Sequence, residues 1–181
     1  MKDNWARERK IQEDDDMRAI AIFVLALAAV AALGMAAGAA EGTVTGSVMY
    51  EGKTVTFKHV YLITGPDVFD PKFTDRTLLF TADDIGDKVR ACESVFCATA
   101  LVINGMTLEF GPNPRLNYWV GVNNQLIQIG GTAIPGEVFK AKADTPDHLA
   151  GLLLIDDSEV QGPAATAEFD VTLTKAFKTH H

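Results

Sequence analysis

Apolar residues dominate one uninterrupted stretch near the start of the sequence. Residues 19–33 are apolar and uncharged, Arg18 precedes them, and small residues follow. A basic residue, an apolar run and a small-residue end are the three parts of a secretory signal peptide. The tripeptide Ala-Gly-Ala at residues 37–39 has the small-x-small form that signal peptidase accepts. The pattern therefore predicts a cleaved signal peptide at residues 17–40.

An uncleaved membrane anchor is the alternative interpretation of this segment. Residues 19–40 carry no charge and are long enough to span a bilayer as a helix. The second half of the segment consists mainly of alanine and glycine, which are only weakly apolar. We therefore prefer a cleaved signal and a periplasmic or secreted domain over a domain anchored in the inner membrane.

Residues 1–16 fit poorly in front of a signal peptide. They contain four basic and six acidic residues, and the segment that stays behind during export is normally biased toward positive charge. We expect Met17 to be the true start of the protein, which would make residues 1–16 a gene-model extension. A disordered tail is the alternative.

Alternation of apolar and polar residues recurs through the rest of the chain. Residues 165–174 show it most clearly, with five apolar positions alternating with five polar ones. Such a segment predicts a strand with one face in the core and one in water. Residues 41–64 alternate around a turn at residues 51–53 and predict a hairpin. Its second arm would direct the odd-numbered residues 55–63 to the core.

The other segments extend this pattern. Asn104-Gly105 and the pair at residues 123–124 are turn formers that predict two further hairpins. A short helix ending near Cys92 follows from the spacing of Ile85, Val89 and Cys92. Strands are predicted at residues 76–81, 99–103, 106–110, 117–122, 125–129, 137–143 and 149–155. About eight or nine strands without a βαβ rhythm predict one all-β domain at residues 41–181, an antiparallel β-sandwich or barrel.

Cys92 and Cys97 are the only cysteines in the sequence. In an oxidising compartment two cysteines this close are expected to form a structural disulfide. Residues five apart in an α-helix lie too far apart to be bridged, so a helix must end between them. A redox pair or half of a metal site is the alternative, but the C-x-x-C spacing and a second cysteine pair are both missing.

Charge and motifs limit the possible functions. Residues 41–181 contain 11 basic and 18 acidic residues, a net charge of −7, and no basic run. This composition argues against nucleic-acid binding. No serine lies in a nucleophile motif, and the acidic pairs at residues 83–84 and 156–157 lack the spacing of a calcium loop. We expect no catalytic residue, no metal and no cofactor, although a carboxylate pair for glycoside hydrolysis stays open.

Two neighbouring aromatic residues are candidates for ligand binding. Alternation directs Tyr118 and Trp119 to opposite faces of their strand, so one ring should enter the core. The other, which we expect to be Trp119 beside Gly121, could contact a sugar or a protein partner. Burial of both rings is the alternative.

The histidines give weaker signals. His59 falls on the expected apolar face of its strand, where it is either a core histidine with one hydrogen-bond partner or a ligand-binding residue. His148 follows a Pro-Asp pair and is expected to be exposed in a turn. His180 and His181 are expected to be frayed.

Two stretches resemble a group of known proteins. Residues 46–67 (GSVMYEGKTVTFKHVYLITGPD) and 167–177 (AEFDVTLTKAF) resemble small exported proteins of Gram-negative bacteria that have no assigned function. These are strand signatures and not catalytic motifs. The resemblance implies a periplasmic or secreted β domain and transfers no functional residue.

These observations lead to an expected function. We expect a non-enzymatic periplasmic or secreted β domain that binds an envelope protein or a small ligand, and that meets the membrane only through an uncleaved signal. One alternative is an envelope hydrolase whose site is not visible in sequence motifs. Another is an inhibitor-like module that acts through residues 65–74 or 111–116. A pocket with His59 or several carboxylates of shifted pKa would favour an enzyme.

Overall fold

The computed structural model describes residues 42–111, 116–122, 125–129 and 135–181. The predicted signal peptide at 17–40 and the predicted extension at 1–16 lie outside these ranges. Among the described residues, no helix combines the length and the apolar character that a bilayer span requires. Ala39–His181 form one compact unit.

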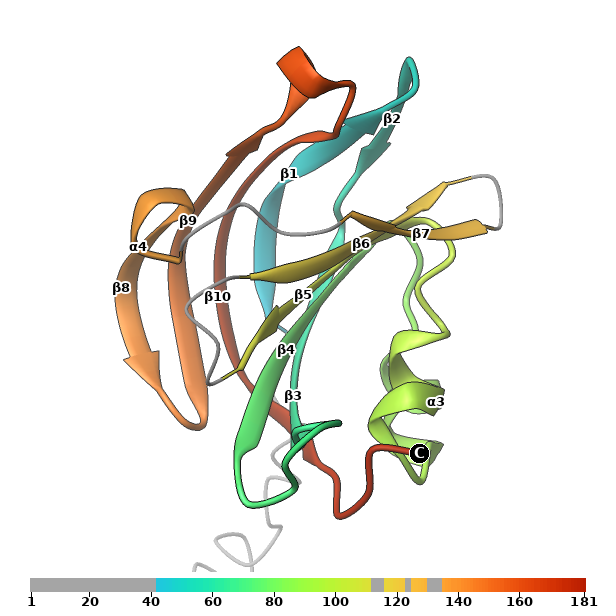
Figure 1. The fold of residues 1–181 in the computed structure, drawn as a ribbon, viewed down its shortest axis with the longest axis vertical. Helices are drawn as coiled ribbons and strands as arrows, with labels where there is room; N and C mark the ends of the chain where they lie inside the picture. Colours follow the sequence, from blue (N-terminus) through green and yellow to red (C-terminus); the bar gives the residue numbers. More distant parts are fainter. Residues whose placement is uncertain (1–41, 112–115, 123–124, 130–134) are drawn as a thin grey trace, which may run out of the picture. The chain divides into compact units, whose positions relative to one another are not determined.

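The described part of the chain forms ten strands in one curled sheet (Figure 1). The hydrogen-bonded order is β2-β1-β10-β3-β4-β5-β6-β7, and β9 pairs with β10 and with β8. All neighbours are antiparallel except β10 and β3, which are parallel. The all-β class is confirmed. The strands are β1 (Thr43–Tyr50), β2 (Lys53–Thr56), β3 (His59–Pro66), β4 (Thr74–Thr81), β5 (Gly105–Phe110), β6 (Asn117–Val122), β7 (Gln125–Ile129), β8 (Phe139–Thr145), β9 (His148–Asp156) and β10 (Ala164–Ala176).

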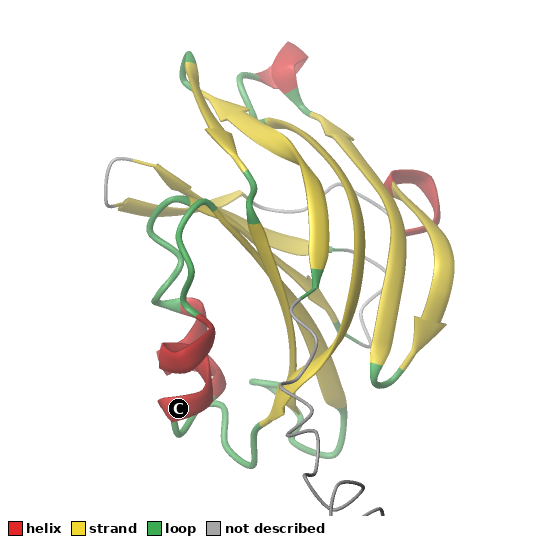
Figure 2. Ribbon diagram, turned by 180° about the vertical axis from the view of Figure 1, so that it is seen from behind, coloured by secondary structure: helices red, strands yellow, loops and turns green. Residues whose placement is uncertain are grey.

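Strand β10 joins two halves of the sheet. Its first part pairs with β9 and β1, and its end pairs with β3. The sheet curls so that the half formed by β8, β9, β10, β1 and β2 faces the half formed by β3 to β7 (Figure 2). The main core fills the space between the halves, with Phe80 of β4 packed edge-on against Phe169 of β10 at a ring distance of 5.3 Å.

The core-facing side of the chain changes between β2 and β3. Phe57 lies in the main core, but its successors in that core are Val60 and Leu62. Tyr61 and Ile63 instead face the other side of the sheet. The prediction that all odd-numbered residues from 55 to 63 face one core is therefore wrong. The chain passes here from pairing with β1 to pairing with β4, and this crossing shifts the alternation.

Two short helices cover the outer face of β3 and β4 and enclose a second core. Helix α2 (Gly86–Ala91) and helix α3 (Val95–Thr99) contribute Val89, Val95 and Ala98 to it. A disulfide joins Cys92, which directly follows α2, to Cys97 of α3. One helix therefore ends and the next begins between the two cysteines. The predicted disulfide and the predicted helix end are confirmed.

The predicted hairpin around Asn104-Gly105 is wrong. Residues 99–103 form no strand, because α3 occupies Val95–Thr99 and turns follow it. Val95, Ala98 and Val102 are all buried in the second core. Their spacing of three and four residues is helical, so packing on this core accounts for the apolar run. The structure also contains α4 (Pro135–Val138) and the 3-10 helix η1 (Ser158–Val160), which were not predicted.

Candidate functional site

A groove of about 280 Å³ lies beside α3 on the outer face of β5, β6 and β7, and we call it the α3 groove. Its surface is mainly apolar, and polar side chains from the sheet and from the segment at His180 complete its lining. Its lining consists of Val68, Phe69, Val95, Phe96, Thr99, Thr107, Glu109, Asn117, Trp119, Leu126, Gln128 and His180.

Strand register assembles the floor of the groove. Thr107 lies opposite Trp119, which lies opposite Gln128, and the next outward-facing pair along the strands is Glu109 and Asn117. The side-chain amide of Asn117 donates a hydrogen bond to Oε1 of Glu109 at 3.3 Å. Outward alternation therefore places an aromatic ring and a carboxylate side by side on one sheet face.

Helix α3 forms one wall and is fixed by its neighbours. The Ser94 hydroxyl caps the helix by accepting a hydrogen bond from the Cys97 N–H at 3.2 Å. The N–H groups of Val95 and Phe96 donate to the carbonyl oxygens of Thr179 and His180. These bonds satisfy amides that a helix start leaves without an intrahelical partner.

The same bonds fix the segment around His180 against α3. The prediction that His180 is frayed is therefore wrong. Its Nδ1 is buried and has no hydrogen-bond partner among the described residues. Burial lowers the pKa of the His180 imidazole, and the nearby His181 lowers it further. His180 is thus a neutral group at the groove near neutral pH.

Aromatic side chains stand at the rim with their rings in solvent. Phe69 is 90% exposed and Phe96 is 60% exposed. Phe69 sits in a turn that Asp67 stabilises, because Oδ1 of Asp67 accepts hydrogen bonds from the N–H groups of Phe69 and Asp70 at 2.8 and 2.6 Å. A phenylalanine exposed to this degree beside a groove leaves apolar area for a ligand to cover.

Three carboxyl groups, Asp67, Asp75 and Glu109, interact with one another, and Glu109 is the one that lines the groove. Asp75 of β4 is 4% exposed, and burial, followed by the charges of Glu109 and Asp67, raises its pKa to about 7. Burial also raises the pKa of Glu109. The pKa of Asp67 is lowered, chiefly by the N–H of Asp70. Gly111 leaves the space for Asp75, since a Cβ there would lie 2.9 Å from Asp75 Oδ1.

No lysine or arginine among the described residues forms an ion pair with these carboxyl groups. Arg76 follows Asp75 directly, but its guanidinium pairs with Asp144 of β8 at 2.5 Å. The ion pairs of the described chain include no bond to Asp67, Asp75 or Glu109. The described residues also contain no group of three His, Cys, Asp or Glu side chains that could hold a metal ion.

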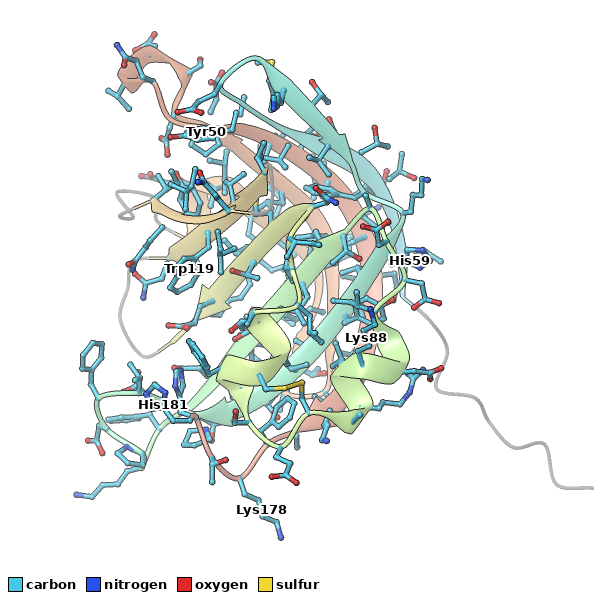
Figure 3. All side chains as sticks on the ribbon, turned by 90° about the vertical axis from the view of Figure 1, so that its right-hand side faces the viewer. Tyr50, His59, Lys88, Trp119, Lys178 and His181 are labelled. Carbon is cyan, nitrogen blue, oxygen red and sulfur yellow. A yellow bond between two sulfur atoms is a disulfide. The ribbon has the colours of Figure 1, made fainter. Side chains whose placement is uncertain are left out.

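The structure separates the three predicted binding residues. Trp119 is half-buried in the groove. Tyr118 is fully buried in the main core, where its hydroxyl donates a hydrogen bond to Asp157 and where burial raises its pKa. His59 is half-buried, stacks on Tyr61 and lies away from Trp119 (Figure 3). The space above Gly121 is filled by the backbone of Val102.

The remaining predictions on polar residues have mixed outcomes. His148 was expected to be exposed in a turn. It is instead half-buried at the start of β9, where its Nε2 lies 2.8 Å from Asp170 Oδ1. Asp84 accepts hydrogen bonds from the Tyr61 hydroxyl and the Gly86 N–H at the start of α2. Of the loop at 111–116, residues 112–115 lie outside the described ranges.

Several groove residues were missed by sequence reasoning. Glu109 and Asn117 stand out only as polar positions within apolar strands, a signal that could have been used. Phe69 lies in the 65–74 loop, which the sequence offered only as a candidate for an inhibitor-like module. Phe96 and His180 carry no local signal, because segments distant in sequence bring them together. Among the residues that the structure describes, no serine or cysteine lines the groove. The chain matches no protein-family model, no curated protein and no solved structure.

Proposed function

We propose that this protein is an exported, non-enzymatic β domain that binds a small ligand in the α3 groove. The observation that supports this most directly is the half-buried ring of Trp119 on the groove floor, with the exposed rings of Phe69 and Phe96 at the rim. Ligand sites are typically concave and mostly apolar, with a few polar groups that orient the ligand. A volume of about 280 Å³ suits a small molecule.

Two features support export to the periplasm or the cell exterior. The segment at residues 17–40 has the pattern of a signal peptide. The Cys92–Cys97 disulfide belongs to the kind of bond that persists in oxidising compartments. Mass spectrometry of the protein from its natural source tests the proposal. A mature start near residue 41 is expected, and recovery of residues 1–16 would contradict it.

A hydrolase is the second candidate, and the raised pKa of Glu109 is what favours it. Glycoside hydrolysis requires two carboxyl groups that flank the scissile bond. Glu109 lines the groove, whereas Asp75 is buried behind it and does not. With Glu109 as the one carboxyl group that lines the groove within the described ranges, ligand binding fits better than this chemistry.

Tryptophan fluorescence tests ligand binding. The chain has two tryptophans, and Trp5 precedes the proposed cleavage site, so Trp119 is the only tryptophan of the mature domain. In the full chain, replacing Trp5 by Phe also leaves Trp119 as the only one. Titration of this variant with small aromatic compounds should shift or quench the emission. Phe69→Ala and Phe96→Ala should weaken binding. Phe73→Ala is the matched control, because the Phe73 ring is exposed as well, at 50%, but does not line the groove. Equal weakening by all three variants would contradict the proposal.

A further inference from the structure

We propose that the ligand of the α3 groove is a small organic cation, an ammonium group on an aromatic or apolar body, with Glu109 as its counter-charge. This inference rests on the proposed function, since it assumes that the groove binds a small ligand. It goes beyond that function by naming the chemical class of the ligand.

Charge is the first argument. Asp67, Asp75 and Glu109 interact with one another, and the described residues supply no lysine or arginine partner for them. Each negative charge makes ionisation of its neighbours less favourable. A cation bound beside Glu109 would offset this repulsion. An anion would instead meet Glu109 and the neutral His180.

Unsatisfied hydrogen-bonding groups are the second argument. Thr107 is fully buried and lines the groove, and its Oγ1 has no hydrogen-bond partner among the described residues. Leaving a buried hydroxyl without a partner is unfavourable. Oε1 of Glu109 accepts a hydrogen bond from Asn117, whereas its Oε2 accepts none from the described residues. An ammonium group carries three donors and no acceptor, which matches these oxygens.

The aromatic lining is the third argument. Trp119, Phe69 and Phe96 all contribute to the groove that contains Glu109. The face of an aromatic ring attracts a cation within about 6 Å, and tryptophan does so most strongly. The same rings bury an apolar ligand body. A carboxylate combined with several rings therefore discriminates a cation from a neutral molecule of the same shape.

Three probes with one aromatic body test the inference on the Trp5→Phe chain. These are 2-phenylethylamine, which is cationic, 2-phenylethanol, which is neutral, and phenylacetate, which is anionic. At pH 8 we expect the amine to bind at least about tenfold more tightly than the alcohol, and phenylacetate to bind most weakly. Glu109→Gln should weaken amine binding about tenfold and leave alcohol binding unchanged. The unchanged alcohol binding also shows that this variant is folded.

Glu93→Gln is the matched control, because Glu93 is exposed and does not line the groove. It should leave all three affinities unchanged. Arg115 lies outside the described residues. The variant Arg115→Gln therefore tests whether this arginine, and not a bound ligand, supplies the positive charge for Glu109. Unchanged or tighter amine binding in that variant supports the inference, and loss of amine binding overturns it.

The titration also separates this inference from the proposed function. Equal binding of amine and alcohol, or an amine affinity unaffected by Glu109→Gln, overturns the cation preference while the groove remains a ligand site. Tighter binding of phenylacetate overturns it in favour of an anion. Failure of all three probes to change Trp119 emission overturns both. Self-association in sedimentation that Phe69→Ala and Phe96→Ala abolish would show that a second copy covers the groove, which also overturns the inference.

Discussion

Replacing Asp75 by Asn should remove a pH-dependent loss of stability. The folded protein raises the pKa of Asp75 from 3.8 to about 7, mainly through burial. The folded state therefore binds this proton more tightly than the unfolded state. Stability from this group is complete below pH 3.8 and is lost as the pH rises through about 7. At about 1.4 kcal/mol for each pKa unit, the loss amounts to at most about 4 kcal/mol.

Urea unfolding at pH 4, 6 and 8, followed by circular dichroism, measures this effect. Asp75→Asn should have nearly the stability of the unmodified protein at pH 4 and exceed it at pH 8. Glu93→Gln, at an exposed carboxylate, should change little at any of these values. The reasoning would be refuted by an Asp75→Asn variant that is less stable at pH 8, or by a stability difference from the unmodified protein that stays constant between pH 4 and pH 8.

Three further substitutions or treatments test the fold. Reduction of the Cys92–Cys97 disulfide should lower the free energy of unfolding by about 2 kcal/mol, since the loop it closes is short; no change in the urea midpoint would contradict this. Gly121→Ala should cost about 2 kcal/mol because its Cβ would lie 2.5 Å from a backbone carbonyl oxygen, whereas Gly136→Ala, with open space around it, should cost little in the same assay. Tyr118→Phe should cost about 1 kcal/mol in thermal or urea unfolding through loss of its hydrogen bond to Asp157, and a neutral result would show that this bond contributes nothing.

The fold could be predicted wherever one face of a strand meets water. Residues 165–174 alternate cleanly and lie within β10, and the hairpin of β6 and β7 pairs as its sequence suggests. The prediction failed at residues 99–103. A short apolar run fits a strand and a buried helical segment equally well, and the local Asn-Gly signal favoured the wrong choice.

The candidate site was predictable only in part. Alternation correctly placed Tyr118 and Trp119 on opposite faces of β6, but the choice of Trp119 rested on a gap beside Gly121 that the backbone of Val102 fills. Glu109 and Gln128, the neighbours of Trp119, depend on strand register, which local sequence does not reveal. Phe96 and His180 depend on how α3 docks on the sheet and on the backbone bond between them. Sequence periodicity contains no information on such long-range contacts.

The position of β10 in the chain has a consequence for assembly. This strand is synthesised after the nine strands with which it completes the sheet, and both halves pair with it directly. Until it emerges from the ribosome, β9 and β1 lack their common neighbour and β3 has an open edge. Contacts so distant in sequence form slowly. The pairing of β10 with β1 and β3 is therefore expected to form late in folding, so that the two halves of the sheet join only after the last strand has been synthesised.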